Sequence, residues 1–348
     1  MRYEPNVKVS GPVKLDIKDK KIMKYLEFNS RQSFSSIAKG VGLSKESVRY
    51  RIKQLEDKGV IQKYKVVIDI KKLDYLVCHI FITLNNPDID VEEQYLQNLN
   101  KFPFVRAIIK YNGDFDYEIA IIGKNIDELD ENITMLLGGI SKFVKRQEVL
   151  LITKNYVVRN LPNSFINFKI EHKKNSKVKN LDKKNIKTGL KKINLIKLDD
   201  KDVKILTEIK DQANAPIYKI SQNTCLSSDI ISYRLKKMKE QKFILSYTTA
   251  FNYHALSYQM YAILLNMNSL DKVLDSKLKT FLEEDDNVVW GVKTIGEYNV
   301  IIYVCTERSS DLHLTLNRIR TTFRENINDY KTLIAYEKLK YTYIPDFF

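Results

Sequence analysis

The sequence predicts an α+β fold in which one arrangement of helices and strands occurs twice in succession. A helix, a tight turn and a second helix can be placed between Arg31 and Ile61, because apolar residues recur there at helical spacing. Strand-like and helical runs then alternate over 76–158. The pattern begins again 183 residues later without a gap. With 348 residues, the chain is long enough for both copies.

The second helix of the predicted pair has a defined start, a defined end and two distinct faces. Ser44 precedes it as a hydroxyl N-cap, Gly42 lies in the turn, and Lys58–Gly59 supply a basic last turn and a glycine stop. The apolar face consists of Val48, Ile52 and Leu55. The cationic face consists of Lys45, Arg49 and Lys53. A helix with these two faces, presented beyond a tight turn, is suited to the major groove of DNA.

We expect a set of polar residues on and around this helix to contact double-stranded DNA. They are Arg31, Ser44, Lys45, Ser47, Arg49, Tyr50, Lys53 and, from the second copy, Lys236. The pattern leaves one alternative open, a three-helix domain whose basic face is merely solvated.

Residues 15–64 carry many characteristic positions of a known family. These are Leu15, Asp16, Asp19, Ile22, Leu26, Arg31, Ile37, Ala38, the run Val41 to Ser44, Val48, Arg51, Leu55, Glu56 and the run Gly59 to Ile61. Together they resemble the winged helix-turn-helix of the leucine-responsive regulator/AsnC (Lrp/AsnC) family of transcription factors. The resemblance implies a sequence-specific DNA-binding transcriptional regulator with a following effector-binding and assembly domain.

Charge and cysteine content narrow the class of protein. The formal net charge of +15 favours an anionic partner such as nucleic acid. Three cysteines lie far apart and form no CxxC pair, so we expect no metal site, no disulfide framework and no cofactor. The sequence has no run of about 18 apolar residues and no apolar signal core at its start. We therefore expect a cytoplasmic, nucleoid-associated protein with no membrane partner.

Residues 76–158 predict a ferredoxin-like βαββαβ domain. The strand-like runs are 76–84, 104–111, 115–123 and 144–158, and the helical runs are 91–102 and 126–137. Asn112–Gly113 between two apolar runs is a strong hairpin signal. This order places helices on one face of an antiparallel sheet. The family resemblance implies the same order for the effector domain.

Loop 111–117 resembles the Gly-Asp-x-Asp loop of that domain, which in family members lies near the cleft where amino acids bind. The residues predicted to bind an amino acid or other small metabolite are Asn112, Gly113, Asp114 and Asp116. Glycine lets a backbone approach a ligand closely, and carboxylates accept hydrogen bonds from an ammonium group. In the alternative, the loop is a tight hairpin whose aspartates only cap the turn. Arg146 and Glu148 stand where the family tends to carry paired hydroxyls. The sequence therefore does not establish whether an amino acid is the effector.

The repeat divides the chain into six predicted segments. They are an N-terminal arm (1–14), a winged helix-turn-helix (15–70), a βαββαβ domain (76–158), a Lys-rich linker (159–197), a second winged helix-turn-helix (198–253) and a second βαββαβ domain (258–343). Ten lysines against two acidic residues in 169–192 predict a flexible stretch, either a solvated tether or a contact to the DNA backbone. We expect the two βαββαβ domains to pair as an intramolecular pseudo-dimer, with a homo-oligomer as the alternative.

The two copies differ most on their DNA-facing side. Residues 15–65 hold thirteen Lys/Arg and six Asp/Glu, whereas 198–248 hold nine and seven. Lys45, Arg49 and Lys53 correspond to Ser228, Ser232 and Lys236. We therefore expect the first helix-turn-helix to carry most of the DNA affinity, and the second to make weak contacts or none.

No sequence motif indicates an enzyme. Walker A, GxSxG, HExxH and GxGxxG patterns are absent, and the four histidines are scattered. His79 lies inside a predicted strand, which favours a packing role. Two other functions stay open. The first is a fused enzyme similar to the siroheme decarboxylases, which are similar to this regulator family in fold and act as two related chains. The second is a nonspecific chromatin-like DNA-binding protein.

Overall fold

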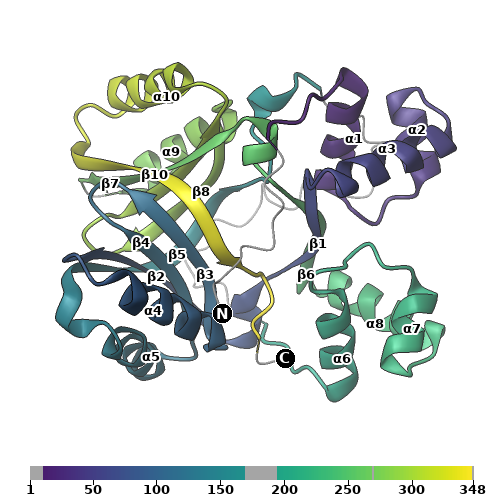
Figure 1. Ribbon diagram of the computed structural model, residues 1–348, viewed down its shortest axis with the longest axis horizontal. Helices are drawn as coiled ribbons and strands as arrows, with labels where there is room; N and C mark the ends of the chain where they lie inside the picture. The colour runs from purple at the N-terminus through teal and green to yellow at the C-terminus, as the bar shows by residue number, and fades with distance from the viewer. Residues whose placement is uncertain (1–10, 169–193, 269, 347–348) are drawn as a thin grey trace.

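The first three helices form where local signals in the sequence predict them. α1 (Ile17–Phe28), α2 (Phe34–Val41) and α3 (Lys45–Asp57) each follow a residue whose side chain caps the helix. α2 ends at Gly42, whose φ of 70° is left-handed, and the chain turns there into α3. The structure is a computed structural model that describes residues 11–168, 194–268 and 270–346 (Figure 1).

Three helices in the second half repeat this unit, and we call the two groups the first and second helical units. The second consists of α6 (Asp200–Ile209), α7 (Ile217–Thr224) and α8 (Ser228–Glu240), each beginning 183 residues after its counterpart. One set of ion pairs also recurs: Arg51 with Asp16 and Asp19, both at 2.7 Å, and Arg234 with Asp199 and Asp202, at 2.7 and 2.8 Å. In each unit these pairs join the start of the first helix to the third helix.

A two-stranded ribbon joins the two helical units. β1 (Ile61–Ile68) pairs antiparallel with β6 (Ile244–Phe251). Tyr64 lies opposite Thr249 and Val66 lies opposite Tyr247, and the 183-residue offset exchanges these two pairs. The units are therefore related by a pseudo-two-fold axis through the ribbon. β1 thus connects the first copy to the second (Figure 1).

The remaining strands form one closed barrel. The first copy contributes β2 (Leu76–Leu84), α4 (Ile89–Lys101), β3 (Val105–Asn112), β4 (Tyr117–Gly123), α5 (Ile126–Gly138) and β5 (Val144–Val158). The second copy contributes β7 (Gln259–Met267), α9 (Lys272–Glu284), β8 (Val288–Ile295), β9 (Val300–Thr306), α10 (Ser309–Thr322) and β10 (Ile327–Tyr341). The order around the barrel is β10-β3-β4-β2-β5-β8-β9-β7.

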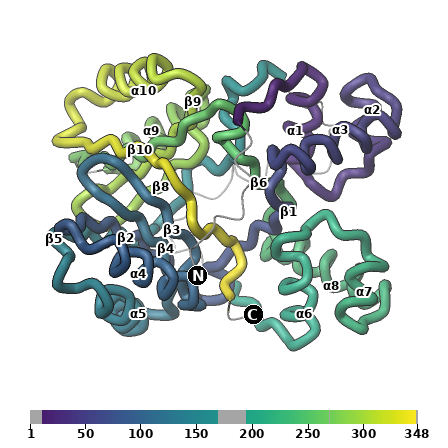
Figure 2. Tube along the Cα trace, viewed as in Figure 1, coloured from purple at the N-terminus to yellow at the C-terminus, as the bar shows by residue number. Residues whose placement is uncertain are grey.

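The barrel closes because the two βαββαβ halves pair edge to edge. β5 pairs with β8, and β10 pairs with β3, both antiparallel. α4 and α5 cover the first half of the barrel, and α9 and α10 cover the second (Figure 2). The predicted α+β class and the predicted intramolecular pseudo-dimer are both confirmed. Among the described helices, none combines the length and apolar character needed to cross a bilayer.

The segment that follows β5 packs against the rest of the protein. The Arg159 N–H donates to the Val289 carbonyl at 2.7 Å, and Phe165 and Ile166 are buried. Residues 159–168, which the sequence assigns to the linker, are thus part of the fold, because their apolar side chains have a core to join. The lysine-rich stretch 169–192 lies outside the described residues, as do residues 1–10 of the arm. The described residues also include four short 3₁₀ helices, at Ile70–Leu73, Ser141–Phe143, Asn163–Phe165 and His254–Leu256.

A polar cluster lies inside the barrel and crosses between the halves. The Glu118 carboxylate, 1% exposed, accepts from Tyr111 Oη at 2.5 Å and lies 2.5 Å from His79 Nδ1. It also accepts from the hydroxyl of Tyr303, which belongs to the second half. Burial, reinforced by the Glu118 charge, raises the pKa of both tyrosines, which therefore stay protonated as donors. His79, predicted to lie inside a strand, is buried in β2.

Replacing Gly296 by alanine should destabilise the contact between the halves. Gly296 has a φ of +147°, and an added Cβ would lie 2.8 Å from the Val149 carbonyl oxygen of β5. We expect a loss of about 2 kcal/mol in the free energy of unfolding, measured by urea denaturation. The control is Gly138→Ala in α5, where a Cβ would meet nothing within 4 Å and alanine favours the helix. Equal effects of the two variants would contradict this account of the contact.

Candidate nucleic-acid interface

α3 is held by an apolar face that is almost completely buried. Val48, Ile52 and Leu55 are at most 4% exposed and join the same core as α1 and α2. The hydroxyl of Ser44 accepts from the Ser47 N–H at 3.0 Å and fixes the start of the helix. At the other end, Gly59 has a left-handed φ of 67°. The predicted start, end and buried face of this helix are confirmed.

The opposite face of α3 is basic and exposed. Lys45, Arg49 and Lys53 are exposed, and Tyr50 beside them is 66% exposed. Within the described part of the chain, none of the three cations forms an ion pair or a side-chain hydrogen bond. Their charges are therefore available to phosphates and base edges. Of the two predicted serines, Ser44 is engaged as the helix cap, and Ser47 is half-buried.

Arg31 does not belong to this surface, which corrects its assignment to the DNA-binding set. Its Nη1 donates to the Ala213 carbonyl at 2.6 Å, and its guanidinium lies 5.3 Å from the centre of the Tyr247 ring. Both partners come from the second half of the chain. Burial lowers the pKa of Arg31. The Arg31 side chain therefore links the two halves of the chain. A contact between residues so far apart in the sequence cannot be predicted from a local pattern.

The second helical unit keeps its core but changes its outer face. Ile231, Leu235 and Met238 of α8 are buried as their counterparts are. Ser228 and Ser232 occupy the positions of Lys45 and Arg49. Tyr233 is 66% exposed, as Tyr50 is, and Lys236 is exposed with a distant Glu240 carboxylate at 3.9 Å. The ribbon therefore relates a helix with cations at all three of these positions to a helix that keeps only one of them, Lys236.

The predicted effector loop is a hairpin at the contact between the halves. Gly113 has a φ of +140°, and the Tyr111 N–H donates to the Asp116 carbonyl at 2.8 Å. An Asp116 carboxylate oxygen accepts from the Leu84 N–H at 2.6 Å, while Asp114 pairs with Lys331 of β10 at 3.2 Å. Both carboxylates thus have protein partners, an arrangement that favours the hairpin alternative for this loop.

Two cavities lie between the ribbon and the barrel, and the sequence predicted neither. The first cavity, of about 940 Å³, is lined by α1, the end of β5, the segment 163–168 and β6. The second cavity, of about 490 Å³, is lined by the end of α3, both ribbon strands and β10. Asn160, Thr248 and Tyr343 line both. Neither cavity is lined by the four predicted effector residues.

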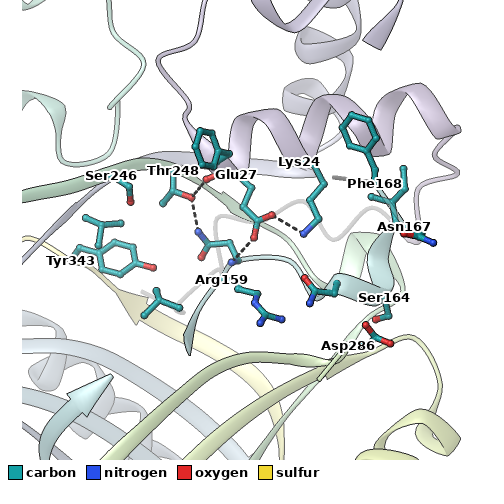
Figure 3. Close-up of a pocket in the computed structure, with 16 residues that line it drawn as sticks. Lys24, Glu27, Arg159, Ser164, Asn167, Phe168, Ser246, Thr248, Asp286 and Tyr343 are labelled. Atoms are coloured by element: carbon teal, nitrogen blue, oxygen red, sulfur yellow. Dashed lines mark hydrogen bonds and ion pairs between the residues drawn. The ribbon is translucent and has the colours of Figure 1, made fainter. Parts of the chain in front are cut away.

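Three charged groups of the first cavity, those of Lys24, Glu27 and Arg159, have protein partners (Figure 3). Glu27 accepts from Lys24 at 2.9 Å and from the backbone N–H groups of Asn160 and Leu161 at 2.8 and 2.7 Å. The guanidinium of Arg159 donates to three backbone carbonyls at and beyond the end of α9. The Glu27 bonds connect α1 to the end of β5. The polar groups that form these bonds stabilise the fold and are not free to bind a ligand.

Comparisons with known proteins match both the first unit and the whole chain. Residues 15–62 match a family model described as winged helix-turn-helix DNA-binding. The HTH-type transcriptional regulator LrpA of Pyrococcus horikoshii is 31% identical over 142 residues, which cover 40% of this chain and 98% of LrpA.

Over nearly the full length, the fold is similar to the crystal structure of the siroheme decarboxylase NirDL. The TM-score is 0.60 at 13% identity, with 93% of this chain and 92% of the other covered. A second structure of NirDL, in complex with an iron-uroporphyrin III analogue, gives a TM-score of 0.59 at 13% identity, with 95% and 96% covered. At this identity the likeness establishes the shared tandem fold alone.

Proposed function

This chain belongs to the Lrp/AsnC family of regulators, and from that premise we propose that it is a sequence-specific DNA-binding transcriptional regulator. One observation carries the proposal. The exposed face of α3 presents Lys45, Arg49 and Lys53 without partners among the residues that the structure describes, on a helix whose other face is buried. Protein surfaces that bind a duplex need such cations, because arginine can form paired hydrogen bonds with guanine and lysine binds phosphates.

The second helical unit acts, in this proposal, as a second winged helix-turn-helix with a weakened DNA face. Its helices begin at the same offset, and its ribbon strand pairs with that of the first unit. Paired helix-turn-helix units place their recognition helices on neighbouring segments of one duplex face. With Ser228 and Ser232 in place of two cations, the second helix contributes orientation and backbone contacts more than base recognition.

A binding-site selection followed by footprinting tests this function. We expect the full chain to select a defined sequence and to protect an asymmetric site, with base-specific contacts confined to one end. Uniform protection of every duplex, with affinity governed by salt alone, would instead indicate a nonspecific chromatin-like protein.

We further propose an amino acid or related metabolite as the effector, bound near loop 112–116. The support is the family membership and the position of this loop at the contact between the halves. We expect a rise in melting temperature with at least one amino acid at millimolar excess, because a ligand that binds only the folded state stabilises it. An Asp114→Asn variant should reduce that rise. If no amino acid shifts the melting temperature, the loop is a structural hairpin only.

A fused siroheme-decarboxylase-like enzyme is the second candidate, and the full-length likeness to NirDL favours it. The discriminating measurement is anaerobic incubation of the full chain with siroheme, followed by mass spectrometry of the tetrapyrrole. Loss of carboxyl groups as carbon dioxide would establish this activity. An unchanged tetrapyrrole, together with selection of a defined operator, would support the regulator function over the enzyme.

A further inference from the structure

The 183-residue offset relates the first cavity to the second. Residues lining the first have counterparts lining the second: Val67 and Ala250, Ser246 and Lys63, Thr248 and Lys65, Val158 and Tyr341, Asn160 and Tyr343. The two cavities therefore occupy related positions in the two copies, one on each side of the pseudo-two-fold axis. Since the backbone arrangement is shared, differences between the two linings are differences of side-chain chemistry.

The second cavity has lysine or tyrosine at several positions where the first has an uncharged, non-aromatic residue. Lys63 and Lys65 replace Ser246 and Thr248, and Tyr341 replaces Val158. Further tyrosine rings line it at positions 253 and 343. Its volume of about 490 Å³ lies within the range of small-molecule sites in proteins.

Lys338 is a lysine of this cavity with no counter-ion among the described residues. Its Nζ lies 5.4 Å from the centre of the Tyr253 ring and 4.8 Å from that of Tyr341. Among the described residues no hydrogen bond or ion pair to this ammonium is found, whereas Lys63 and Lys65 both bind Asp211. Lys338 is exposed where it lines the cavity, and the protein packed around it lowers its pKa by desolvation. An anion in the cavity therefore meets an accessible ammonium group.

Two of the three carboxylates near the cavity, Glu118 and Glu56, already bind protein groups. Glu118, whose charge acts on Lys338 from inside the barrel, is bound by His79 and two tyrosines. Glu56 accepts from the Tyr64 hydroxyl. Asp57 is exposed at the end of α3.

We propose that the second cavity binds a small aromatic carboxylate, whose anion pairs with Lys338 and whose ring packs among Tyr253, Tyr341 and Tyr343. Lysine supplies the point charge for the carboxylate, and tyrosine rings favour offset or edge-on packing against a flat ligand. A strongly hydrated inorganic anion would gain nothing from these rings. The site is independent of DNA binding and of loop 112–116, and the related position to Lys338 in the first copy is the uncharged Asn155.

Isothermal titration of the full chain with benzoate and benzamide tests the site, because the two probes share shape and differ in charge. We expect benzoate to bind one site per chain at least about tenfold more tightly than benzamide, as for a charge-assisted contact. Lys338→Met should abolish this preference, and Lys338→Arg should retain most of it. Equal binding of the two probes, or no binding of benzoate at millimolar concentration, would overturn the proposal.

Two control variants and two control probes assign the binding to this cavity. Lys279→Met removes an exposed lysine from α9, and Arg49→Ala removes a cation from α3, so both should leave benzoate affinity unchanged. A loss in either would place the site elsewhere. Acetate and inorganic phosphate should bind much more weakly than benzoate. If either binds as tightly, the tyrosine rings do not select the ligand and the proposal fails.

Discussion

Replacing Arg49 by alanine is expected to weaken binding to the selected operator by roughly 5- to 150-fold, because one bidentate arginine contact to a base is worth about 1–3 kcal/mol. Arg49 lies at the middle of the exposed cationic face of α3, between Lys45 and Lys53, and has no protein partner among the described residues. The variant should also relax the base preference at one or two positions. Gel-shift titration on the operator and on a random duplex measures both effects.

Ser232→Ala is the matched control, since Ser232 occupies the position of Arg49 in the second helical unit. We expect its operator affinity to stay within a few-fold of the native chain, because serine offers one short hydroxyl and no charge. Both variants keep the buried faces of α3 and α8, so folding is not at issue. Should Ser232→Ala prove as damaging as Arg49→Ala, both helices recognise bases and the charge difference between the copies is misleading.

Replacing Glu118 by alanine is expected to lower the free energy of unfolding by about 3–5 kcal/mol, as for other buried charged networks that lose one partner. The carboxylate is 1% exposed and holds Tyr111, Tyr303 and His79. Its removal leaves two hydroxyls and an imidazole inside the barrel without an acceptor, and each buried polar group without a partner is costly. Urea denaturation at neutral pH measures the loss.

Two further variants separate the network from the mere loss of a carboxylate. Tyr303→Phe removes only the hydroxyl that reaches across the halves to Glu118 and lies 3.4 Å from His79 Nδ1, and should cost about 1.5–3 kcal/mol, the usual range for a hydrogen bond to a charged group. Glu93→Ala removes an exposed carboxylate of α4 and should change stability by less than about 0.5 kcal/mol. If Glu118→Ala is no more damaging than Glu93→Ala, the cluster does not stabilise the barrel.

Local signals in the sequence were enough to place most elements. The predicted strands 76–84 and 144–158 match β2 and β5 at both ends, and the predicted cap at Ser44 begins α3. Every α-helix and β-strand of the second half begins 183 residues after its counterpart. These features follow from caps, periodicity and turn residues, which act over a few neighbouring positions and can be recognised without the fold.

The sequence by itself determined the α+β class, the tandem repeat, and the contrast between Lys45, Arg49 and Lys53 in the first copy and Ser228, Ser232 and Lys236 in the second. Only the tertiary structure decided that Arg31 binds Ala213, that Glu118 joins Tyr303, and that the ribbon and barrel enclose two cavities with different linings. The partners in the first two contacts are 182 and 185 residues apart in the chain. Such contacts depend on how the copies dock, and docking is fixed by complementary surfaces of the whole fold, which no local pattern of residues encodes.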